Sequence, residues 1–439
     1  MSLFTAAFLM VIAVLIVLGS GIDVGTGLAL IGIIGLKYFF SGSEAIIGVN
    51  LYNSCASFIL AAVPLFVFMG EIVMRTGIVK ALYRGVSKWL SPFPGGLLHS
   101  NIFASSIFAA ISGSSSATTA TIGSIAFPEE QKRKYPLNIT LGSLSAGGTI
   151  GILIPPSITM IIYGAMTGVS VGKLFVAGVI PGIIMALLFM VYIFGYSIIN
   201  KDKMPEIEKI SIKEYFVNSL MAWKDLWPFA LIIATIFIGI YGGLMTPTEA
   251  GAVSVIEAMI IAILFRKLNF KVLKESALAT LKTSTMVLFI LIGASLLGTF
   301  ISMIKLPAQL CIAVGDAGIG RYAVLLSIIG IYIVLGCLIE ACALEIITLP
   351  IVFPLLVTRL GFNSLWVGIL IVILTQIALI TPPVGMNLYI MYGISGKKDM
   401  NRVISGVLPF FIIMFCVIAL FMVFPEIVTF LPDRMFSQY

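Results

Sequence analysis

The segment Ile154-Pro155-Pro156-Ser157 decides how this sequence folds, because a similar segment returns about 227 residues later as Thr381-Pro382-Pro383-Val384. Proline lacks a backbone N–H and its ring clashes with the preceding turn, so two prolines in succession interrupt a helix. A Tyr-Gly pair follows each copy, and Gly178-Val-Ile-Pro181 and Gly406-Val-Leu-Pro409 then recur at nearly the same separation. Several landmarks at one separation indicate that the chain arose by duplication.

The composition places this duplication in a membrane. Of the 439 residues, 60% are apolar and 10% are charged, whereas soluble domains carry about 25% charged residues. A membrane span needs roughly 20 mostly apolar residues, and about ten to twelve segments approach that length. The first of them, Leu3–Leu18, is expected to be a retained span, because no Lys or Arg precedes Lys37 to form a signal peptide. The sequence therefore predicts an all-α polytopic membrane protein.

Charge indicates the orientation of the two halves. The net charge of +7 comes from basic residues that cluster in short loops, which is the pattern of cytoplasmic loops, so no nucleic-acid partner is expected. The clusters Arg75–Lys88 and Arg266–Lys274 are therefore assigned to the cytoplasm. Their counterparts in the other half, Pro307–Arg321 and Lys37–Glu44, carry no basic excess. Opposite bias in equivalent loops predicts two repeats of inverted topology.

The predicted repeats occupy residues 1–199 and 227–439, and residues 200–226 join them. Acidic and basic residues nearly balance in this linker, and its apolar residues recur at roughly helical spacing. We interpret it as an amphipathic helix on the cytoplasmic surface of the membrane, with a plain cytoplasmic loop as the alternative.

Several kinds of chemistry lack the residues that they need. The single histidine, His99, has no cysteine at ligand spacing, so no zinc site is predicted. Gly168–Leu174 fails as a phosphate-binding loop, because three residues separate its glycines and neither Ser nor Thr follows Lys173. These absences argue against an ATP-driven pump and a redox enzyme. The cysteines are expected to be buried thiols rather than disulfides: Cys55, Cys311, Cys337, Cys342 and Cys416.

A hydroxyl-rich segment, Ser112–Thr121, interrupts the apolar sequence of the first half. Seven of its ten residues are Ser or Thr. Small hydroxyl residues also let helices pack closely, which is the alternative interpretation. Unwound backbone at membrane depth is tolerated only where it is buried in protein or lines a cavity. Because hydroxyl and carbonyl oxygens suit a hard cation, the segment predicts a Na⁺ site.

The paired prolines predict further exposed carbonyls. Glycines surround both pairs, at Gly147, Gly148 and Gly151 in the first half and at Gly385 in the second. A kink without any ligand would explain one pair. Broken helices at matching positions in two inverted halves instead indicate the binding site of a transporter.

Acidic residues are few within the apolar segments, and each is costly there unless it is paired or hydrated. Upstream of the second proline pair, Leu335-Gly336-Cys337 falls opposite Ile111-Ser112-Gly113, and Glu340 and Glu345 follow it. Either glutamate can face a cavity or form a structural pair, and the sequence leaves both possibilities open.

Two other acidic residues have structural assignments. Glu249 lies in Thr246-Pro247-Thr248-Glu249, where it is expected to cap a helix rather than contact a substrate. Glu71 lies four residues before Arg75, so the two are expected to pair on one helix.

Taken together, these motifs resemble the large membrane subunit of tripartite ATP-independent periplasmic (TRAP) transporters. The resemblance implies a secondary transporter of the bacterial inner membrane that takes up organic acids, such as dicarboxylates or sialic acid, with Na⁺. It implies a separate small four-helix Q subunit and a periplasmic substrate-binding P protein. It also implies an elevator motion of a transport domain, built with re-entrant helical hairpins, against a scaffold. The segments that carry it are Pro64–Glu71, Ser112–Pro128, Ile154–Ser157, Thr246–Gly251 and Thr381–Gly385.

The same resemblance implies functional residues by position, within hairpin regions at about 103–165 and 330–395. It implies no catalytic residue. The residues for a first Na⁺ site are Ser112, Ser115, Gly148, Gly151, Ile154 and Pro156, and those for a second are Gly336, Thr381, Gly385 and Met386. The residues for substrate are Ser114, Ser115, Ser116, Thr118, Glu340, Pro383 and Asn387.

Three other functions compete with this hypothesis. A stand-alone divalent-anion symporter without partners typically has Ser-Asn-Thr at its hairpin tips, and the sequence lacks that triplet. A channel needs a continuous pore, which paired broken helices disfavour. An intramembrane enzyme would need a dyad such as Ser with His, which the motifs do not supply.

Overall fold

The computed structural model describes residues 10, 12–14, 16–17, 19–40, 44–206, 211–316, 318–397 and 399–436. Every regular element among these residues is a helix, which confirms the predicted all-α class. Most of the predicted span Leu3–Leu18 lies outside the described residues. Parts of Lys37–Glu44 and Pro307–Arg321 also lie outside them, so the charge argument for inverted loops stays a prediction.

Seven described helical segments are long and apolar enough to cross a membrane. They are Phe58–Arg75, Val171–Ile199, Ile212–Tyr241, Pro247–Leu264, Phe270–Met303, Ala341–Arg359 and Met400–Val423. Shorter apolar helices are Val24–Phe39, Leu97–Ser112, Ile158–Thr167, Arg321–Gly336 and Ser364–Ile380. Several of the predicted spans are thus too short to cross a bilayer alone, because they belong to hairpins and broken helices.

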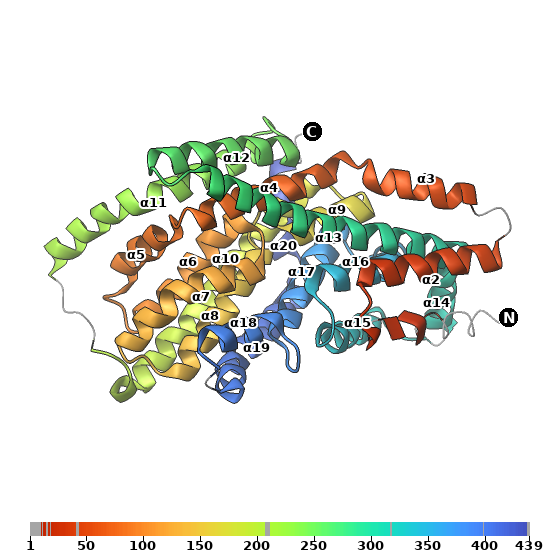
Figure 1. The fold of residues 1–439 in the computed structure, drawn as a ribbon. Helices are drawn as coiled ribbons and strands as arrows, with labels where there is room; N and C mark the ends of the chain where they lie inside the picture. The colour runs from red at the N-terminus through yellow and green to blue at the C-terminus, as the bar shows by residue number, and fades with distance from the viewer. Residues whose placement is uncertain are drawn as a thin grey trace.

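The first half begins with helices that lie outside the hairpin region (Figure 1). These are α2 (Val24–Phe39), α3 (Glu44–Cys55), η1 (Phe58–Ala61), α4 (Ala62–Arg75) and α5 (Val79–Leu90). The hairpin consists of α6 (Leu97–Ser112) and α7 (Ser115–Lys132). A broken helix follows, and then the long α10: α8 (Leu137–Thr149), η2 (Ile150–Ile152), α9 (Ile158–Thr167) and α10 (Val171–Ile199).

The second half repeats this order after the short η3 (Lys201–Lys203). Its first helices are α11 (Ile212–Tyr241), α12 (Pro247–Leu264), α13 (Phe270–Met303) and α14 (Leu306–Asp316). Its hairpin is α15 (Arg321–Gly336), α16 (Ala341–Phe353) and the π-helical η4 (Pro354–Arg359). Its broken helix and final helices are α17 (Ser364–Ile380), α18 (Met386–Ile394), α19 (Met400–Val423) and α20 (Glu426–Phe436).

The helix order therefore agrees with a duplicated chain. In each half a hairpin is followed by a helix that breaks at the paired prolines, between η2 and α9 and between α17 and α18. The hairpins start at Leu97 and Arg321, before the expected 103 and 330, because each includes the whole first arm. The hairpin tip and the proline break are separate features, although each predicted hairpin region included both of them.

Part of the linker is helical, and its position on the membrane surface stays a prediction. Helix α11 starts at Ile212 inside the linker and continues without interruption to Tyr241 as one of the long apolar helices. Its first half lies along α5, where Asp225 accepts hydrogen bonds from Arg84 at 2.6 Å and Lys88 at 3.1 Å. Two polar segments of the chain thus brace each other, while the exposed Ile212 faces outward.

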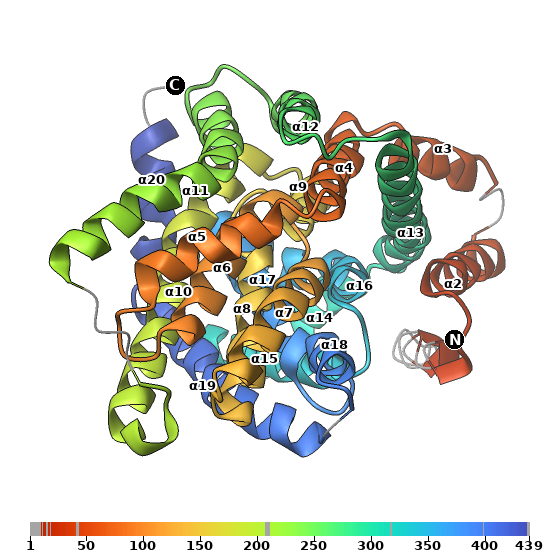
Figure 2. The same cartoon turned by 60° about the vertical axis from the view of Figure 1, so that its left-hand side comes forward.

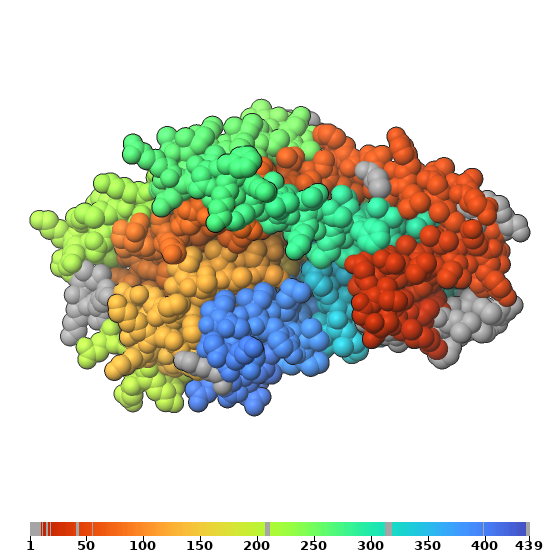
Figure 3. All heavy atoms as spheres, viewed as in Figure 1, coloured from red at the N-terminus to blue at the C-terminus, as the bar shows by residue number. Residues whose placement is uncertain are grey.

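Two layers organise the molecule. Helices α2, α4, α12 and α13 pack side by side and lie along one long edge, together with α11 (Figures 1 and 2). The hairpins and broken helices form the other layer, in which the C-terminal region packs directly on the first hairpin (Figure 3). We refer to these layers as the scaffold layer and the hairpin layer.

Local sequence explains where several helices begin. Thr246 and Glu249 form a reciprocal capping box at the start of α12, which confirms the capping assignment of Glu249. Ser114 caps α7 and Ser157 caps α9 through their hydroxyl oxygens. Gly113 ends α6 with a left-handed φ of 58°, a conformation that glycine adopts without steric cost.

The matched glycines mark close helix contacts. A side chain at Gly406 would place its Cβ 1.9 Å from the Asn138 carbonyl oxygen of α8. A side chain at Gly178 would meet the Leu153 carbonyl oxygen at 2.6 Å. Both repeats thus use the same landmark to bring a long helix against the hairpin layer.

Not all cysteines are buried as expected. Cys416 is exposed on α19, while Cys337 and Cys342 are half-buried, and all three are free thiols. The exposed thiol lies on a long apolar helix, where a lipid-facing side chain does not need to be covered by protein. The side chains of Cys55 and Cys311 lie outside the described part of the structure.

Candidate functional site

The first hairpin tip is held together by its own hydroxyls. The Ser112 and Thr118 hydroxyls lie 2.9 Å apart, and Thr118 Oγ1 donates to the Ser114 carbonyl oxygen at 2.8 Å. Ser112, Ser115 and Thr118 are buried, whereas Ser114 and Ser116 are half-buried. The tip is therefore a polar turn that lies between the apolar helix α6 and the hydroxyl-rich start of α7.

The first proline break lies against this tip. A Cβ on Gly113 would approach the Pro156 carbonyl oxygen to 3.1 Å, and a Cβ on Gly151 would lie 3.4 Å from Thr118 Oγ1. Gly148 is closer still, because its Cβ would lie 1.8 Å from Thr119 Oγ1. That hydroxyl is buried and has no hydrogen-bond partner among the described residues. Glycines at these positions bring hydroxyl and carbonyl oxygens together without an intervening side chain.

The second proline break is more open. Thr381 is buried and donates to the Ile377 carbonyl oxygen at 2.6 Å, and the Gly385 amide donates to the Thr381 carbonyl oxygen at 3.0 Å. Pro383 and Met386 are exposed. Gly385 offers no side-chain cap to α18, and the Leu388 amide donates to its backbone carbonyl oxygen at 2.8 Å. Both Pro-Pro peptide bonds, in the first and second breaks, are cis.

Asn387 joins the two halves. It is fully buried at the start of α18, and its amide donates to Ser115 Oγ at 2.9 Å and to the Ser145 carbonyl oxygen at 3.1 Å. Its own carbonyl oxygen, Oδ1, is buried without a partner in the described structure. Next to it the Ser116 hydroxyl lies 3.1 Å from Met386 Sδ. The predicted residues Ser115, Ser116, Met386 and Asn387 therefore lie together.

The second hairpin tip contacts its own broken helix. A Cβ on Gly336 would lie 2.4 Å from the Ala378 Cβ of α17, three residues before Thr381. Glu340 caps α16, since its carboxylate accepts from the Cys342 and Ala343 amides at 2.9 and 3.2 Å. Its carboxylate is thus engaged by its own helix, and its role toward a substrate stays a prediction.

Each hairpin also packs on the broken helix of the other half. Helix α7 of the first hairpin packs on α18 of the second break, and α16 of the second hairpin packs on α9 of the first break. Each hairpin tip also lies against the broken helix of its own half: Gly336 lies against Ala378 of α17, and Gly113 lies against the Pro156 carbonyl oxygen. Ile154 contributes packing as well, because a Cβ on Gly182 of α10 would meet Ile154 Cγ1 at 2.7 Å.

A buried polar network lies at the other end of the first hairpin, and no function was predicted for it. Glu130 Oε1 accepts from Asn101 Nδ2 at 2.7 Å. The same amide donates to Ser143 Oγ at 2.9 Å, and the Tyr83 hydroxyl donates to Asn101 Oδ1 at 3.1 Å. The network joins α5, α6, α7 and α8. Its only sequence signal is a set of polar residues within apolar helices.

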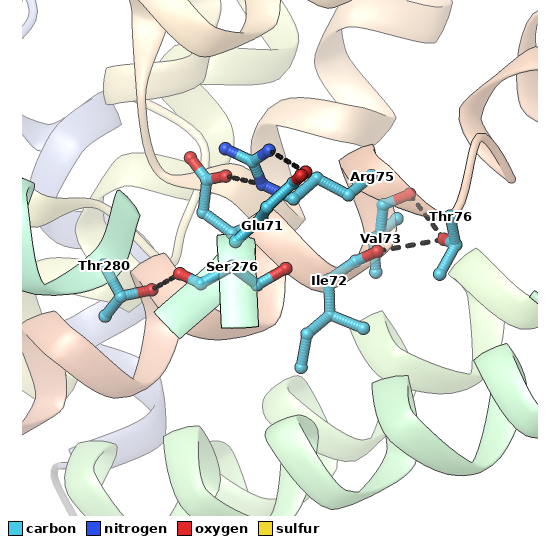
Figure 4. A network of polar contacts seen from close by, with 8 residues as sticks. Glu71, Ile72, Val73, Arg75, Thr76, Ser276 and Thr280 are labelled. Carbon is cyan, nitrogen blue, oxygen red and sulfur yellow. Dashed lines mark hydrogen bonds and ion pairs between the residues drawn. The ribbon is translucent and has the colours of Figure 1, made fainter. Parts of the chain in front are cut away.

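The scaffold layer presents charges near the first tip. Arg75 donates to Glu71 at 2.9 Å, as predicted, and to Glu275 of α13 at 3.1 Å. Figure 4 shows this pair beside Ser276, whose backbone oxygen accepts from the Thr280 hydroxyl. A small cavity of about 80 Å³ separates the layers, and its lining includes Glu71, Ser112, Ser114 and Thr283.

The fold and the site together define a multi-pass membrane protein of the secondary-transporter class, with paired hairpins and broken helices around a buried polar centre. Comparison with known families agrees: the model of the tripartite ATP-independent periplasmic transporter, DctM component, matches residues 9–427. The chain belongs to this family. It is therefore a transporter permease of the inner membrane and not an enzyme.

Individual relatives align over nearly the whole of this chain. The C4-dicarboxylate TRAP transporter large permease protein DctM of Pseudomonas aeruginosa is 33% identical and covers 92% of each chain. The 2,3-diketo-L-gulonate TRAP transporter large permease protein YiaN of Escherichia coli is 30% identical over 95% of this chain and 98% of its own. The isethionate TRAP transporter permease protein DctMQ of Oleidesulfovibrio alaskensis is 31% identical over 94% of this chain but 64% of its own.

A solved structure shares the fold. The YdaH transporter of Alcanivorax borkumensis, described as having an unusual topology, superposes with a TM-score of 0.63 over 89% of this chain and 91% of its own. The identity is 13%, so the likeness concerns the fold alone.

Proposed function

We propose that this chain carries out Na⁺-coupled uptake of a small organic acid, such as a dicarboxylate or a sugar acid like sialic acid, by an elevator mechanism. The observation that carries the proposal is the Asn387 junction, where α18 of one half meets α7 and α8 of the other. There a buried amide carbonyl without a partner lies beside hydroxyls and broken helices.

The anionic substrate is supported by the ends of the short helices. The N-terminus of a helix attracts negative charge through its free amides and its dipole. Glu340 already supplies a carboxylate to α16, and Ser114 caps α7, but α18 has no side-chain cap. We therefore assign the acid group of the substrate to the start of α18, within reach of Ser116. The relatives are named as transporters of C4-dicarboxylate, 2,3-diketo-L-gulonate and isethionate, and all of these compounds are organic anions.

Na⁺ coupling is supported by oxygens that lack donors. Thr119 Oγ1 and Asn387 Oδ1 are buried and unpartnered within the described structure, and the carbonyl of Pro156 faces the Gly113 turn. A buried polar atom without a partner destabilises the protein, whereas a bound cation would satisfy it. In transporters with broken helices, unwound carbonyls coordinate the coupling ion. In this proposal Na⁺ is transported together with the organic acid, so it is a second substrate.

The elevator motion is supported by how the two layers meet. A Cβ on Gly70 of α4 would lie 2.9 Å from the Ser112 Cα at the first tip. A Cβ on Gly298 of α13 would lie 3.3 Å from Pro350 of the second hairpin. Each hairpin thus meets the scaffold layer at a glycine, where there is no side chain to block sliding.

Two partners complete the proposal. A four-helix Q subunit would cover apolar surface of the scaffold layer, where side chains such as Leu30, Ile34 and Ile260 are exposed. A periplasmic P protein would deliver the substrate. The DctMQ relative, whose name joins both membrane components in one chain, supports a Q subunit as a partner.

The test is uptake by proteoliposomes that contain this chain and its Q subunit. Labelled dicarboxylate, keto acid and sialic acid are supplied with the P protein, under an inward Na⁺ gradient or an equal K⁺ gradient. The proposal predicts uptake of one of these acids that needs both Na⁺ and the P protein. Uptake without the P protein would instead identify a stand-alone symporter, and equal uptake in K⁺ would refute the coupling.

A further inference from the structure

Glu345 is an acidic residue that the proposed Na⁺ and substrate sites leave unused. It lies in the first turns of α16, within the second hairpin, and its exposed fraction is 0%. Both carboxylate oxygens are buried and have no hydrogen-bond partner among the described residues. The structural pairing considered from the sequence is therefore absent there.

The polar neighbours of Glu345 are committed elsewhere. Tyr163 of α9 lies within electrostatic range, but its hydroxyl donates to the Ser364 carbonyl oxygen at 2.7 Å. Tyr332 of α15 is also in range, and its hydroxyl is hydrogen-bonded to Thr348. The Thr348 hydroxyl in turn contacts the Leu344 carbonyl oxygen at 2.8 Å. No neighbouring hydroxyl of this set is left to stabilise an ionised Glu345.

The charged groups around α16 do not compensate either. Glu340 is the acidic group that acts on Glu345, and it disfavours a second negative charge. Cys342 is the nearby thiol. Helix α17, which packs on α16, contains no titratable residue, and α9 contributes Tyr163 alone. The basic residues of α13 belong to its first thirteen residues, and Arg359 ends η4.

The contrast with Glu130 shows what a stabilised buried acid has in this protein. Glu130 is equally buried, but Asn101 donates to it at 2.7 Å. Glu345 has no donor of this kind. A buried carboxylate without a donor or a counter-charge is strongly disfavoured as an anion, so it takes up a proton or binds a cation.

A proton fits Glu345 better than a metal ion. Hard metal cations need several oxygen ligands, and the neighbouring hydroxyls of Tyr163, Tyr332 and Thr348 are each engaged in a hydrogen bond with another group. A proton needs one carboxylate oxygen. Glu340, five residues before Glu345, is half-buried and lies within electrostatic range of it.

We propose that Glu345 is a proton-binding site of the second hairpin, which carries one proton across the membrane with the hairpin layer. The carboxylate becomes a carboxylic acid when it takes up the proton on one side, and it releases the same proton when the tip opens to the other side. The inference rests on the proposed uptake for its role in transport, but not for the bound proton itself.

The bound proton is tested by infrared spectroscopy of the purified full chain in lipid. The carbonyl stretch of a protonated carboxyl should be present at neutral pH and should lose the Glu345 contribution in Glu345→Gln, which imitates the neutral acid; the buried Glu130 contributes to the same region of the spectrum in both proteins. The exposed Glu426 supplies the matched control, because Glu426→Gln should leave that band unchanged. If Glu345→Gln does not assemble, Glu345→Asp retains a carboxyl and should shift the band. A spectrum that neither variant alters would overturn the proposal.

The transport role is tested by uptake at a fixed Na⁺ gradient, with the outside made more acidic than the inside. The wild type should be stimulated, and Glu345→Gln should lose that stimulation while it keeps Na⁺-dependent uptake. Equal stimulation of both proteins would overturn the coupled role. Failure of the wild type to take up any acid would refute the proposed function instead, and the infrared result would still decide whether Glu345 holds a proton.

Discussion

Truncation of Asn387 separates the cost of a lost hydrogen bond from the loss of a Na⁺ ligand. Asn387→Ala removes two hydrogen bonds, to Ser115 and to the Ser145 carbonyl oxygen, at 2.9 and 3.1 Å. Each contributes about 1 kcal/mol net, so their loss destabilises the fold by about 2 kcal/mol. The same change removes the unpartnered Oδ1, whose burial costs about 1 to 3 kcal/mol without a cation.

The two contributions partly offset each other in the absence of Na⁺, although the truncation also leaves the buried Ser115 hydroxyl without its donor. We therefore expect the Na⁺-free Tm of Asn387→Ala to fall somewhat below that of the wild type. With Na⁺ the balance changes, because the wild-type Oδ1 then has a partner. A loss of about 1.4 kcal/mol in the Na⁺-bound state alone raises the half-saturating Na⁺ concentration tenfold.

The assay is thermal unfolding of the purified chain across a Na⁺ titration in constant total salt. Asn138→Ala is the matched control, because this exposed asparagine also donates to a serine of the other half, Ser405, at 3.3 Å. It should leave the Na⁺ response unchanged. An Asn387→Ala protein with the wild-type Na⁺ response would refute the assignment of Oδ1 as a ligand.

Three further predictions follow from single contacts. Gly148→Ala places a Cβ 1.8 Å from Thr119 Oγ1, so overpacking of about 1 to 3 kcal/mol should lower Tm and weaken Na⁺ activation of uptake; Gly195→Ala, with nothing within 4 Å, is its control. Asp225→Asn weakens two ion pairs to α5 that solvent partly screens, so it should reduce the free energy of unfolding by about 1 to 2 kcal/mol and thereby lower Tm, without changing Na⁺ dependence. Gly70→Ala should slow uptake while retaining the Na⁺-dependent rise in Tm. An unchanged uptake rate would contradict the proposal that the first hairpin slides past α4 at this glycine.

The features that sequence predicts well are local. Paired prolines break helices wherever they occur, so the breaks after η2 and α17 follow from residues 155–156 and 382–383 alone. The capping box at Thr246 and the pairing of Glu71 with Arg75 depend on residues three or four apart. Repetition of the glycine landmarks then gives the order of hairpin, broken helix and long helix.

The features that sequence misses depend on contacts across the chain. The Asn387 and Ser115 side chains are 272 residues apart, and no periodicity brings α18 to α7. The network of Asn101, Glu130 and Ser143 joins three helices in the same way. We expected the linker and the next span to be separate elements. Helix α11 instead begins inside the linker at Ile212 and continues through Pro228 to Tyr241. These outcomes follow from tertiary packing, which outweighs local propensity.

The measurement that tests the central claim most directly is Na⁺ binding to the purified chain, followed as Tm against NaCl with KCl as the balancing salt. Our account predicts a saturable rise in Tm that is specific for Na⁺, and a lower half-saturating Na⁺ concentration when the transported acid is present, since binding stabilises the folded state and coupling is reciprocal. An equal effect of NaCl and KCl, with or without the acid, would contradict it.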